Sequence, residues 1–355
     1  MAKLRAGVIG IGVIATTKHI PNLAKREDVE IVALCDIDAA KAEKANQDFG
    51  LNAKIYTDWK EVCSNPDIDV IEVCTPNPLH YPITMAALEG GKHVHCEKPL
   101  AVHYSECLEM IAKAKEVGKK LTSGLQWRYN PATMKLKEMV KEGVFGDIFY
   151  VKSQQMRPRL LPAYGAYTSK EKNGGGVLLD AGPHSIDLPM WLLDNYDIAS
   201  VRGMHWDKMK NFPAANELGP WDPEHFDVED TAVALLTLKN GIAIYIEVSW
   251  ASNLDQSAPG VVAEICGNKG GADMKGPGFE NYVRLTHVVD DKLVHDEIKC
   301  EPDKIDMYAY DINHWIDAIQ NDTDPAVLPE QAATVTRVIE GIYKSAETGE
   351  TVYFD

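Results

Sequence analysis

The stretch LRAGVIGIGVIA, residues 4–15, is an apolar run that ends in a glycine-rich turn. Its last six residues, GIGVIA, match the pattern G-x-G-x-x-A. The glycines permit a tight turn and let the backbone approach a pyrophosphate, while the small Ala15 lets the next helix pack closely on the strand. The N-terminus of that helix would face the phosphates. We therefore predict that a dinucleotide contacts Gly10, Gly12, Val13 and Ile14.

An acidic residue follows the next strand-like run, residues 30–35. Asp36 lies close to the spacing of about 20 residues after the turn at which a carboxylate binds the adenosine ribose. Such a carboxylate accepts hydrogen bonds from both ribose hydroxyls and repels a 2′-phosphate. No arginine follows it, since the next residues are Ile37 and Asp38. The sequence thus predicts NAD rather than NADP, and the alternative is an ordinary turn with a surface aspartate.

The first third of the chain alternates strand-like and helix-like stretches. The strand-like stretches are short, continuous apolar runs, which are typical of a parallel sheet covered on both faces. This alternation predicts a doubly wound sheet. The predicted strands are residues 4–9, 30–35, 70–74, 93–96 and 121–123, and the predicted helices are residues 14–25, 39–49, 59–64, 81–89 and 105–117.

The pattern changes after residue 125. Long strand-like runs with hairpin-type turns between them predict an antiparallel sheet. We therefore predict a dinucleotide-binding domain at residues 1–125 and a second domain at residues 126–355. The predicted strands of the second domain are residues 146–155, 200–206, 230–238, 243–249, 261–266, 282–289 and 292–298, and its predicted helices are residues 130–142, 309–320 and 329–348.

The loop after the fourth predicted strand is polar. In open parallel sheets ligands bind outside the carboxyl ends of the strands. Thr75, Asn77 and His80 are therefore candidate cofactor contacts. His80 could equally be a residue at the start of a helix, without a role in binding.

Residues 96–101, CEKPLA, follow the fifth predicted strand. Together with residues 10–15, with Thr75-Pro76-Asn77 and with the Asp180-x-x-x-His184 spacing, they resemble the Gfo/Idh/MocA family, the group of glucose–fructose oxidoreductase and inositol dehydrogenase. The resemblance extends nearly from end to end. It implies a Rossmann domain followed by an α/β domain with a large, open, mostly antiparallel sheet. It also implies an NAD-dependent oxidoreductase of CH–OH groups, whose substrate is a sugar, a polyol or a related compound.

By the same resemblance, Lys98, Asp180 and His184 lie around the reacting carbon, and Glu97 and Lys98 contact the cofactor. Oxidation of a secondary alcohol needs a base for the hydroxyl proton, and histidine suits this because its pKa is near neutral. A cation stabilises the developing alkoxide. We assign His184 as general base, Lys98 as partner of the reacting oxygen, and Asp180 as partner of the substrate or of Lys98. Relatives can exchange the roles of the lysine and the histidine.

The four-residue spacing of Asp180 and His184 predicts that both lie on one side of a helix. Further candidate substrate contacts are Arg128 and Asn130, just after the last predicted strand of the first domain, and Tyr164 in an irregular stretch rich in arginine and tyrosine. Their neighbours Trp127 and Tyr129 could equally be core residues, and the alternative for the stretch around Tyr164 is a solvated or interface loop.

Composition narrows the class of protein. Lys and Arg number 36 against 53 Asp and Glu, which gives a net charge of −17. This charge argues against nucleic-acid or membrane partners, which require basic patches. The seven cysteines form no C-x-x-C pair, so we expect reduced core thiols, a cytoplasmic location and no metal site. Alternating apolar residues in 230–238 and 243–249 predict an uncovered apolar face, and hence a homodimer or homotetramer.

Three functions stay open at this point. The first is an NAD-dependent dehydrogenase of a sugar, a sugar derivative or an inositol. The second is an enzyme that retains NAD and cleaves glycosides by transient ring oxidation and elimination. The third is an NAD-binding regulator without catalysis, whose expected sign would be the loss of Lys98 or His184, and both are present.

Overall fold

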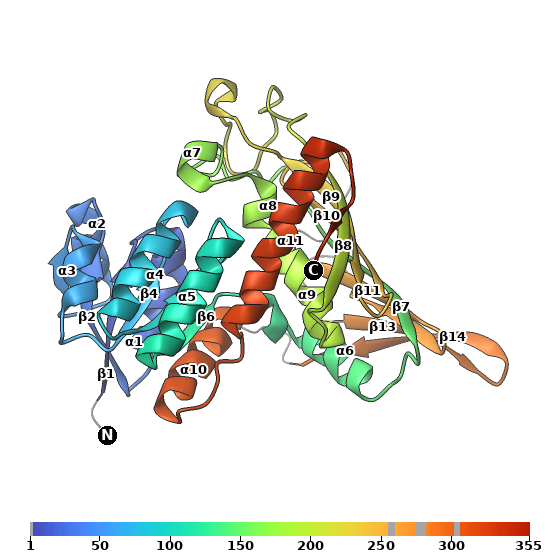
Figure 1. The fold of residues 1–355 in the computed structure, drawn as a ribbon, viewed down its shortest axis with the longest axis horizontal. Coiled ribbons are helices and arrows are strands. Elements are labelled where there is room, and N and C mark those ends of the chain that lie inside the picture. Colours follow the sequence, from blue (N-terminus) through green and yellow to red (C-terminus); the bar gives the residue numbers. More distant parts are fainter. Residues whose placement is uncertain (1–2, 255–259, 275–281, 302–305) are drawn as a thin grey trace. The chain divides into compact units, whose positions relative to one another are not determined.

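The computed structural model describes residues 3–254, 260–274, 282–301 and 306–355. The chain forms two compact units (Figure 1). The first contains Met1–Gln126 and Asp306–Thr336, and the second contains Trp127–Ile305 and Arg337–Asp355. The predicted domains, residues 1–125 and 126–355, therefore do not include the return of residues 306–336 to the first unit.

The sheet of the first unit has six parallel strands in the order β3-β2-β1-β4-β5-β6. This confirms the predicted doubly wound parallel sheet. The edge strand β3 was not predicted, because its three residues contain only one buried side chain. The bounds are β1 Leu4–Ile9, β2 Val29–Cys35, β3 Lys54–Tyr56, β4 Val70–Val73, β5 His93–Cys96 and β6 Leu121–Ser123.

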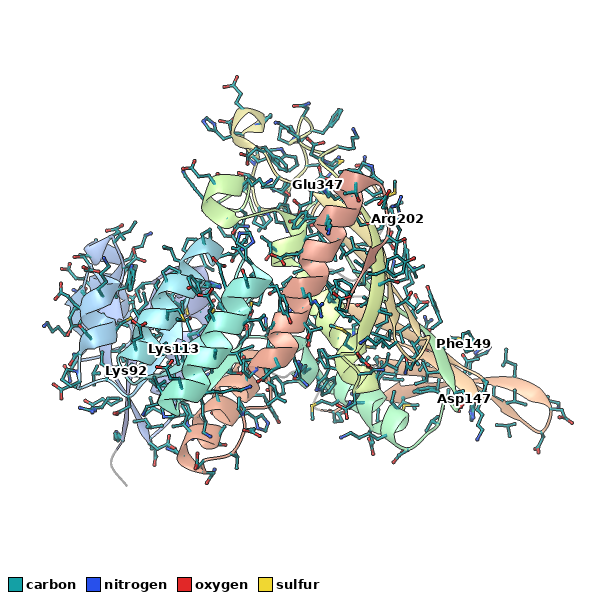
Figure 2. The ribbon with its side chains drawn as sticks, viewed as in Figure 1. Lys92, Lys113, Asp147, Phe149, Arg202 and Glu347 are labelled. Carbon is teal, nitrogen blue, oxygen red and sulfur yellow. The ribbon has the colours of Figure 1, made fainter. Side chains whose placement is uncertain are left out.

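Helices connect these strands, with charged side chains such as Lys113 of α5 on their outer sides (Figure 2). The predicted helix at residues 14–25 is wrong in one respect, because it opens with a π-helical turn, η1 (Ala15–His19), before α1 (Ile20–Ala24). The remaining helices are α2 Ala39–Asp48, α3 Trp59–Ser64, η2 Asn77–Leu79, α4 His80–Glu89, α5 Tyr104–Val117, η3 Gln126–Tyr129 and α10 Met307–Gln320.

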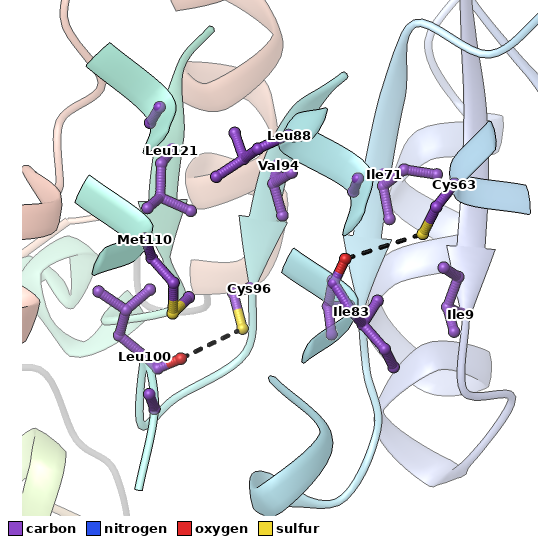
Figure 3. Packing of buried hydrophobic residues seen from close by; sticks show 14 of the residues in the cluster. Ile9, Cys63, Ile71, Ile83, Leu88, Val94, Cys96, Leu100, Met110 and Leu121 are labelled. Carbon is purple, nitrogen blue, oxygen red and sulfur yellow. Dashed lines mark hydrogen bonds between the residues drawn. The ribbon is translucent and has the colours of Figure 1, made fainter. Parts of the chain in front are cut away.

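Apolar side chains cover both faces of this sheet. Because successive residues of a strand point to opposite faces, Val8 and Ile9 enter two separate clusters. Figure 3 shows the cluster around Ile9, Ile71 and Val94, into which Cys63 and Cys96 pack as thiols. The other cluster includes Trp315 of α10, which explains why this late helix belongs to the first unit.

The second unit contains a nine-stranded sheet in the order β14-β13-β12-β11-β7-β10-β9-β8-β15. Neighbouring strands are antiparallel except for β7 and β10, so the prediction of a mostly antiparallel sheet is confirmed. β12 was not predicted, because it is short and begins with two glycines, which are unfavourable inside a strand. The bounds are β7 Ile148–Met156, β8 Ile198–Trp206, β9 Thr231–Leu238, β10 Ala243–Ser249, β11 Val262–Gly267, β12 Gly270–Asp273, β13 Tyr282–Val289, β14 Lys292–Lys299 and β15 Val352–Tyr353.

Helix α9 packs against β7, β10 and β11 and covers one face of this sheet. On β9 the buried and the more exposed side chains alternate, as expected for a sheet with one covered face. The helices are α6 Pro131–Lys141, α7 Lys170–Asn173, α8 Val177–Asp180, α9 Gly182–Leu193, η4 Pro223–His225 and α11 Pro329–Thr348. Among the described helices, none is both long and apolar enough to cross a bilayer.

Candidate functional site

The predicted dinucleotide turn begins directly after β1. Gly10 has φ 91° and its N–H donates to the Cys35 carbonyl oxygen at 2.8 Å. A Cβ at Gly10 would lie 2.6 Å from the Cys74 carbonyl oxygen, so no other residue fits. A Cβ at Gly12 would meet no described atom within 4 Å. The turn therefore packs tightly on the protein at Gly10 and is open at Gly12, as a turn that receives a phosphate group must be.

Asp36 lies where β2 ends and is fixed by backbone donors. Its Oδ2 accepts the Ile11 N–H at 2.8 Å, and its Oδ1 accepts the Asp38 N–H at 3.0 Å. Ile37 beside it is 92 % exposed. The carboxylate is therefore joined to the glycine turn itself, while Val13 and Ile14 continue from the turn into η1.

His80 lies underneath the loops that follow β4 and β5. Its buried ring places Nδ1 2.7 Å from the Pro99 carbonyl oxygen and Nε2 2.9 Å from the Thr75 carbonyl oxygen. Burial lowers the pKa of His80. These contacts indicate that His80 positions the two loops. Asn77 begins η2, and the Thr75 hydroxyl is buried without a hydrogen-bond partner among the described residues.

Glu97 leaves β5 and turns inward. Its Oε1 lies 2.8 Å from His19 Nε2, and its Oε2 accepts the Lys98 N–H at 3.2 Å. Burial alone would raise the pKa of Glu97, but the hydrogen bond and the charge of His19, together with the charges of Lys98 and His95, lower it to about 2. Lys98 itself is half-buried. The predicted cofactor contact of Glu97 therefore competes with a contact inside the protein.

Asp180 and His184 lie at the junction of two short helices. The prediction that one helix carries both is wrong, because α8 ends at Asp180 and α9 begins at Gly182. Asp180 Oδ2 accepts the Trp250 Nε1–H at 2.7 Å and an Arg157 Nη1–H at 3.3 Å. Both predicted catalytic side chains are nearly buried, Asp180 at 9 % exposure and His184 at 6 %.

A buried carboxylate holds the start of α8. Glu229 accepts the N–H groups of Gly176 at 3.1 Å and Leu178 at 2.9 Å, and the Tyr343 hydroxyl donates to it at 2.8 Å. A Cβ at Gly176 would lie 2.0 Å from the Glu229 carbonyl oxygen, so glycine is required there. The sequence prediction gave Glu229 no role, although the carboxylate pair Glu229-Asp230 directly before a strand was its signal.

The predicted substrate contacts at Arg128, Asn130 and Tyr164 have different surroundings. Arg128 is 2 % exposed and forms two hydrogen bonds with Asp187, at 2.8 and 2.6 Å, and one with the Tyr196 hydroxyl at 2.8 Å. This geometry does not favour a substrate contact. Asn130 caps α6 through its Oδ1. Tyr164 is exposed, and its ring packs edge-on against Tyr167.

The prediction did not find a group of buried ionisable side chains in the first unit. His19, Glu72 and His95 bring their nitrogen and oxygen atoms within 4.8 Å of one another, a set of a kind that metals also bind. His19 Nδ1 forms a hydrogen bond of 2.9 Å with Glu72 Oε2, whereas His95 Nδ1 lies 3.0 Å from the same oxygen without hydrogen-bond geometry. The signal in the sequence was a charged residue inside each of two apolar strands, VIEV and HVHC.

Two family models match the chain. One, described as "Oxidoreductase family, NAD-binding Rossmann fold", matches residues 4–125, and the other, "Oxidoreductase family, C-terminal alpha/beta domain", matches residues 137–354. Their names, GFO_IDH_MocA and GFO_IDH_MocA_C, agree with the resemblance noted from the motifs.

Relatives match the chain over nearly its whole length. D-glucoside 3-dehydrogenase of Escherichia coli is 32 % identical over 352 residues, covering 98 % of this chain and 97 % of the relative. Inositol 2-dehydrogenase of Salmonella typhimurium is 27 % identical, covering 98 % and 96 %. The structure of an aldose–aldose oxidoreductase from Caulobacter crescentus superimposes with a TM-score of 0.82 at 24 % identity, covering 99 % and 100 %.

Proposed function

Because the chain belongs to the GFO_IDH_MocA oxidoreductase family, whose first domain is an NAD-binding Rossmann fold, we propose that it oxidises a secondary hydroxyl of a sugar, a sugar derivative or an inositol. The observation that carries this proposal is the 32 % identity, over 98 % of the chain, with a relative named D-glucoside 3-dehydrogenase. A D-glucoside is therefore the first substrate to test.

The glycine turn and Asp36 fit NAD. The open side of Gly12 leaves room for a pyrophosphate, and Asp36 is held by the same turn at the end of β2. When bound, NAD supplies the nicotinamide that accepts a hydride. We propose that the adenosine half of NAD is held by Gly10, Gly12, Val13, Ile14 and Asp36. The loop with Thr75 and Asn77 then contacts the cofactor beyond this half. In this assignment His80 acts through that loop.

The proposed chemistry uses three side chains of this protein on one substrate hydroxyl. His184 accepts its proton, and Lys98 stabilises the developing negative charge on its oxygen. Asp180 orients the substrate, because its Oδ2 already accepts hydrogen bonds from Trp250 and Arg157 and is therefore held in one direction. Asn130 and Tyr164 stay candidate substrate contacts.

The test uses the purified full-length chain with NAD and a panel of methyl D-glucosides, aldoses and inositols. We expect NADH absorbance with at least one member, and transfer of deuterium from the oxidised carbon to NADH. Turnover of a glycoside without net NADH, with the deuterium returned to the sugar, would replace this proposal by the NAD-retaining cleavage reaction. Label that appears in solvent would reject hydride transfer. Absence of both reactions over the whole panel would reject the proposal.

Assembly and location are further proposals. On the more exposed face of the second sheet, Leu235 of β9 pairs with Arg202 of β8, which Figure 2 labels. Leu235 is 46 % exposed, and Met204, two residues after Arg202 on β8, is 53 % exposed. We propose that this face joins copies of the chain into a homodimer or homotetramer, which light scattering at micromolar concentration would show. None of the seven cysteines, all of which lie among the described residues, forms a disulfide, which favours a reducing compartment such as the cytoplasm.

A further inference from the structure

Five ionisable side chains form a continuous buried chain inside the first unit, referred to below as the buried charge chain. It begins at Glu97, whose Oε1 lies 2.8 Å from His19 Nε2. His19 Nδ1 lies 2.9 Å from Glu72 Oε2, and the same oxygen lies 3.0 Å from His95 Nδ1. His95 Nε2 lies 3.1 Å from Asp311 Oδ2. All five residues are buried, and they come from η1, β4, β5, the turn after β5 and α10.

The geometry favours protons on both rings, most directly on His19, both of whose nitrogens lie in hydrogen-bond geometry to carboxylate oxygens. Each imidazole has a carboxylate oxygen at both of its nitrogens, and a neutral imidazole can donate from only one nitrogen, which would place its other lone pair against an anion. Two imidazolium ions leave the three carboxylates with a net charge of −1. Burial lowers the pKa of His95, but Glu72 and Asp311 raise it to about 10, and the pKa of His19 is also raised well above its usual value despite burial.

Other groups face the chain at both ends. The Cys74 thiol faces His19, and the charge of Lys98 acts on Glu97. The ring of Trp315 lies beside His95, with the ring centroids 6.2 Å apart. Lys98 is a second cation that acts on Glu97, but His19 lies within hydrogen-bond distance of Glu97 Oε1 and lowers its pKa most, so His19 is its principal counter-ion.

Glu97 forms the end of the buried charge chain that lies next to the predicted catalytic residue Lys98. Glu97 Oε2 accepts the N–H of Lys98, so one carboxylate joins the buried charge chain to the peptide that carries the predicted catalytic lysine. Gly124 makes room for it, because a Cβ there would lie 3.3 Å from Glu97 Oε1. His19 ends η1, the π-helical turn that follows the glycine turn. The chain therefore links the backbone beside the cofactor turn to the backbone of Lys98.

We infer that His19, supported by Glu72, His95 and Asp311, is a positioning residue that keeps Glu97 a carboxylate and thereby fixes the Lys98 peptide for catalysis. The kinetic part of this inference rests on the proposed function. Without the His19 imidazolium, only the charges of Lys98 and His95 would oppose the effect of burial on Glu97, and its pKa would rise. A protonated Glu97 donates from one oxygen and holds the Lys98 N–H less firmly.

The first test needs no substrate. In the full-length protein labelled with ¹⁵N-histidine, two rings should show protonated Nδ1 and Nε2 at pH 7.5, assigned by the loss of each signal in His19→Gln and His95→Gln. Neutral rings at these positions would overturn the inference. One equivalent of tightly bound metal in protein purified without chelator would also overturn it, because a divalent ion would then replace the two protons.

The second test is the pH dependence of kcat in His19→Gln. We expect a fall of about tenfold or more, as small misplacement of a catalytic group produces, together with a new loss of activity on the acidic side. Adding Glu97→Gln should remove this new acidic limb, because the group that titrates is then absent. A folded His19→Gln variant with an unchanged pH profile would overturn the inference.

The matched control is His93→Gln. His93 shares β5 with His95, and its ring also lies beside Trp315, but its Nδ1 accepts the Lys120 N–H at 3.1 Å and belongs to no part of the charge chain. The same substitution there should leave the pH profile unchanged. If the wild-type protein turns over no substrate at all, the proposed function fails, while the ¹⁵N experiment still decides whether the chain is filled with protons.

Discussion

Glu97 and Asp180 are carboxylates that lie close in sequence to predicted catalytic residues, and the protein holds them in opposite ways. Glu97, one residue before Lys98, faces the imidazole of His19 in a buried charge chain. Asp180, four residues before His184, accepts hydrogen bonds from the indole of Trp250 and from Arg157. An indole N–H does not titrate and arginine keeps its charge. The geometry at Lys98 therefore depends on bound protons, whereas the geometry at Asp180 depends on packing and permanent donors.

The largest effect on kcat is expected from substitution of Lys98 and His184, the predicted catalytic residues that follow these two carboxylates in sequence. Lys98→Ala and His184→Ala should each lower kcat by at least about 10²-fold, because each removes a proton acceptor or an alkoxide partner. Both variants should still bind NAD in a fluorescence titration, because neither side chain builds the pyrophosphate site, whereas Gly12→Val should abolish binding by filling the open side of the turn. His184→Ala with near-normal turnover would show that the assignment of the base is wrong.

The second effect concerns Asp36, a carboxylate that accepts hydrogen bonds from two backbone N–H groups. Replacing it by Asp36→Ser together with Ile37→Arg removes the charge that repels a 2′-phosphate and adds one that attracts it. We expect the ratio of kcat/KM for NAD to that for NADP to fall by about tenfold or more, since each factor of ten needs only about 1.4 kcal/mol. Equal use of NADP by the unchanged protein would contradict the role of Asp36.

The third prediction sharpens the contrast on the side of Asp180. Trp250→Phe keeps most of the buried ring but removes the donor to Asp180 Oδ2. We expect kcat to fall by about tenfold through loss of orientation, without a new limb in the pH profile. Trp221→Phe is the control, because its indole donates to the Lys210 carbonyl oxygen at 2.7 Å. A loss of activity as large in Trp221→Phe would assign the effect to packing rather than to Asp180.

Local chemistry predicted those parts of the fold whose contacts lie close in sequence. The strands Leu4–Ile9, His93–Cys96 and Ala243–Ser249 have the predicted bounds, because each is an apolar or alternating run that ends at a turn. The edge strand Lys54–Tyr56 and the strand Gly270–Asp273 were not predicted. Both are short, and the neighbouring strands decide their conformation.

The same distinction applies to the site. The close packing at Gly10 and the hydrogen bond between Asp36 and the turn follow from a local motif. The burial of Arg128 depends on Asp187, far along the chain, and no spacing rule connects them. The buried charge chain likewise joins residues from five separate elements, so each histidine looked ordinary in its own segment. Partners at long range are what the sequence alone could not supply.

The smallest effect expected here tests the dependence on protons directly, through stability. The pKa of His95 is raised to about 10, so its contribution is fully present below the unfolded-state pKa near 6.5 and is lost as the pH rises through about 10. The pKa of Glu72 and of Glu97 is lowered to about 2, so their contribution is present above about 4.5 and is lost as the pH falls through about 2. The contribution of the charge chain should therefore be greatest between about pH 4.5 and 6.5.

In calorimetry, the difference in Tm between the wild type and His95→Gln should shrink as the pH rises from 7 to 10. Between the wild type and Trp250→Phe it should stay constant, because no titrating donor is lost. A constant difference for His95→Gln would mean that its ring is neutral in the folded protein, and the contrast between the two carboxylates would then lose its physical basis.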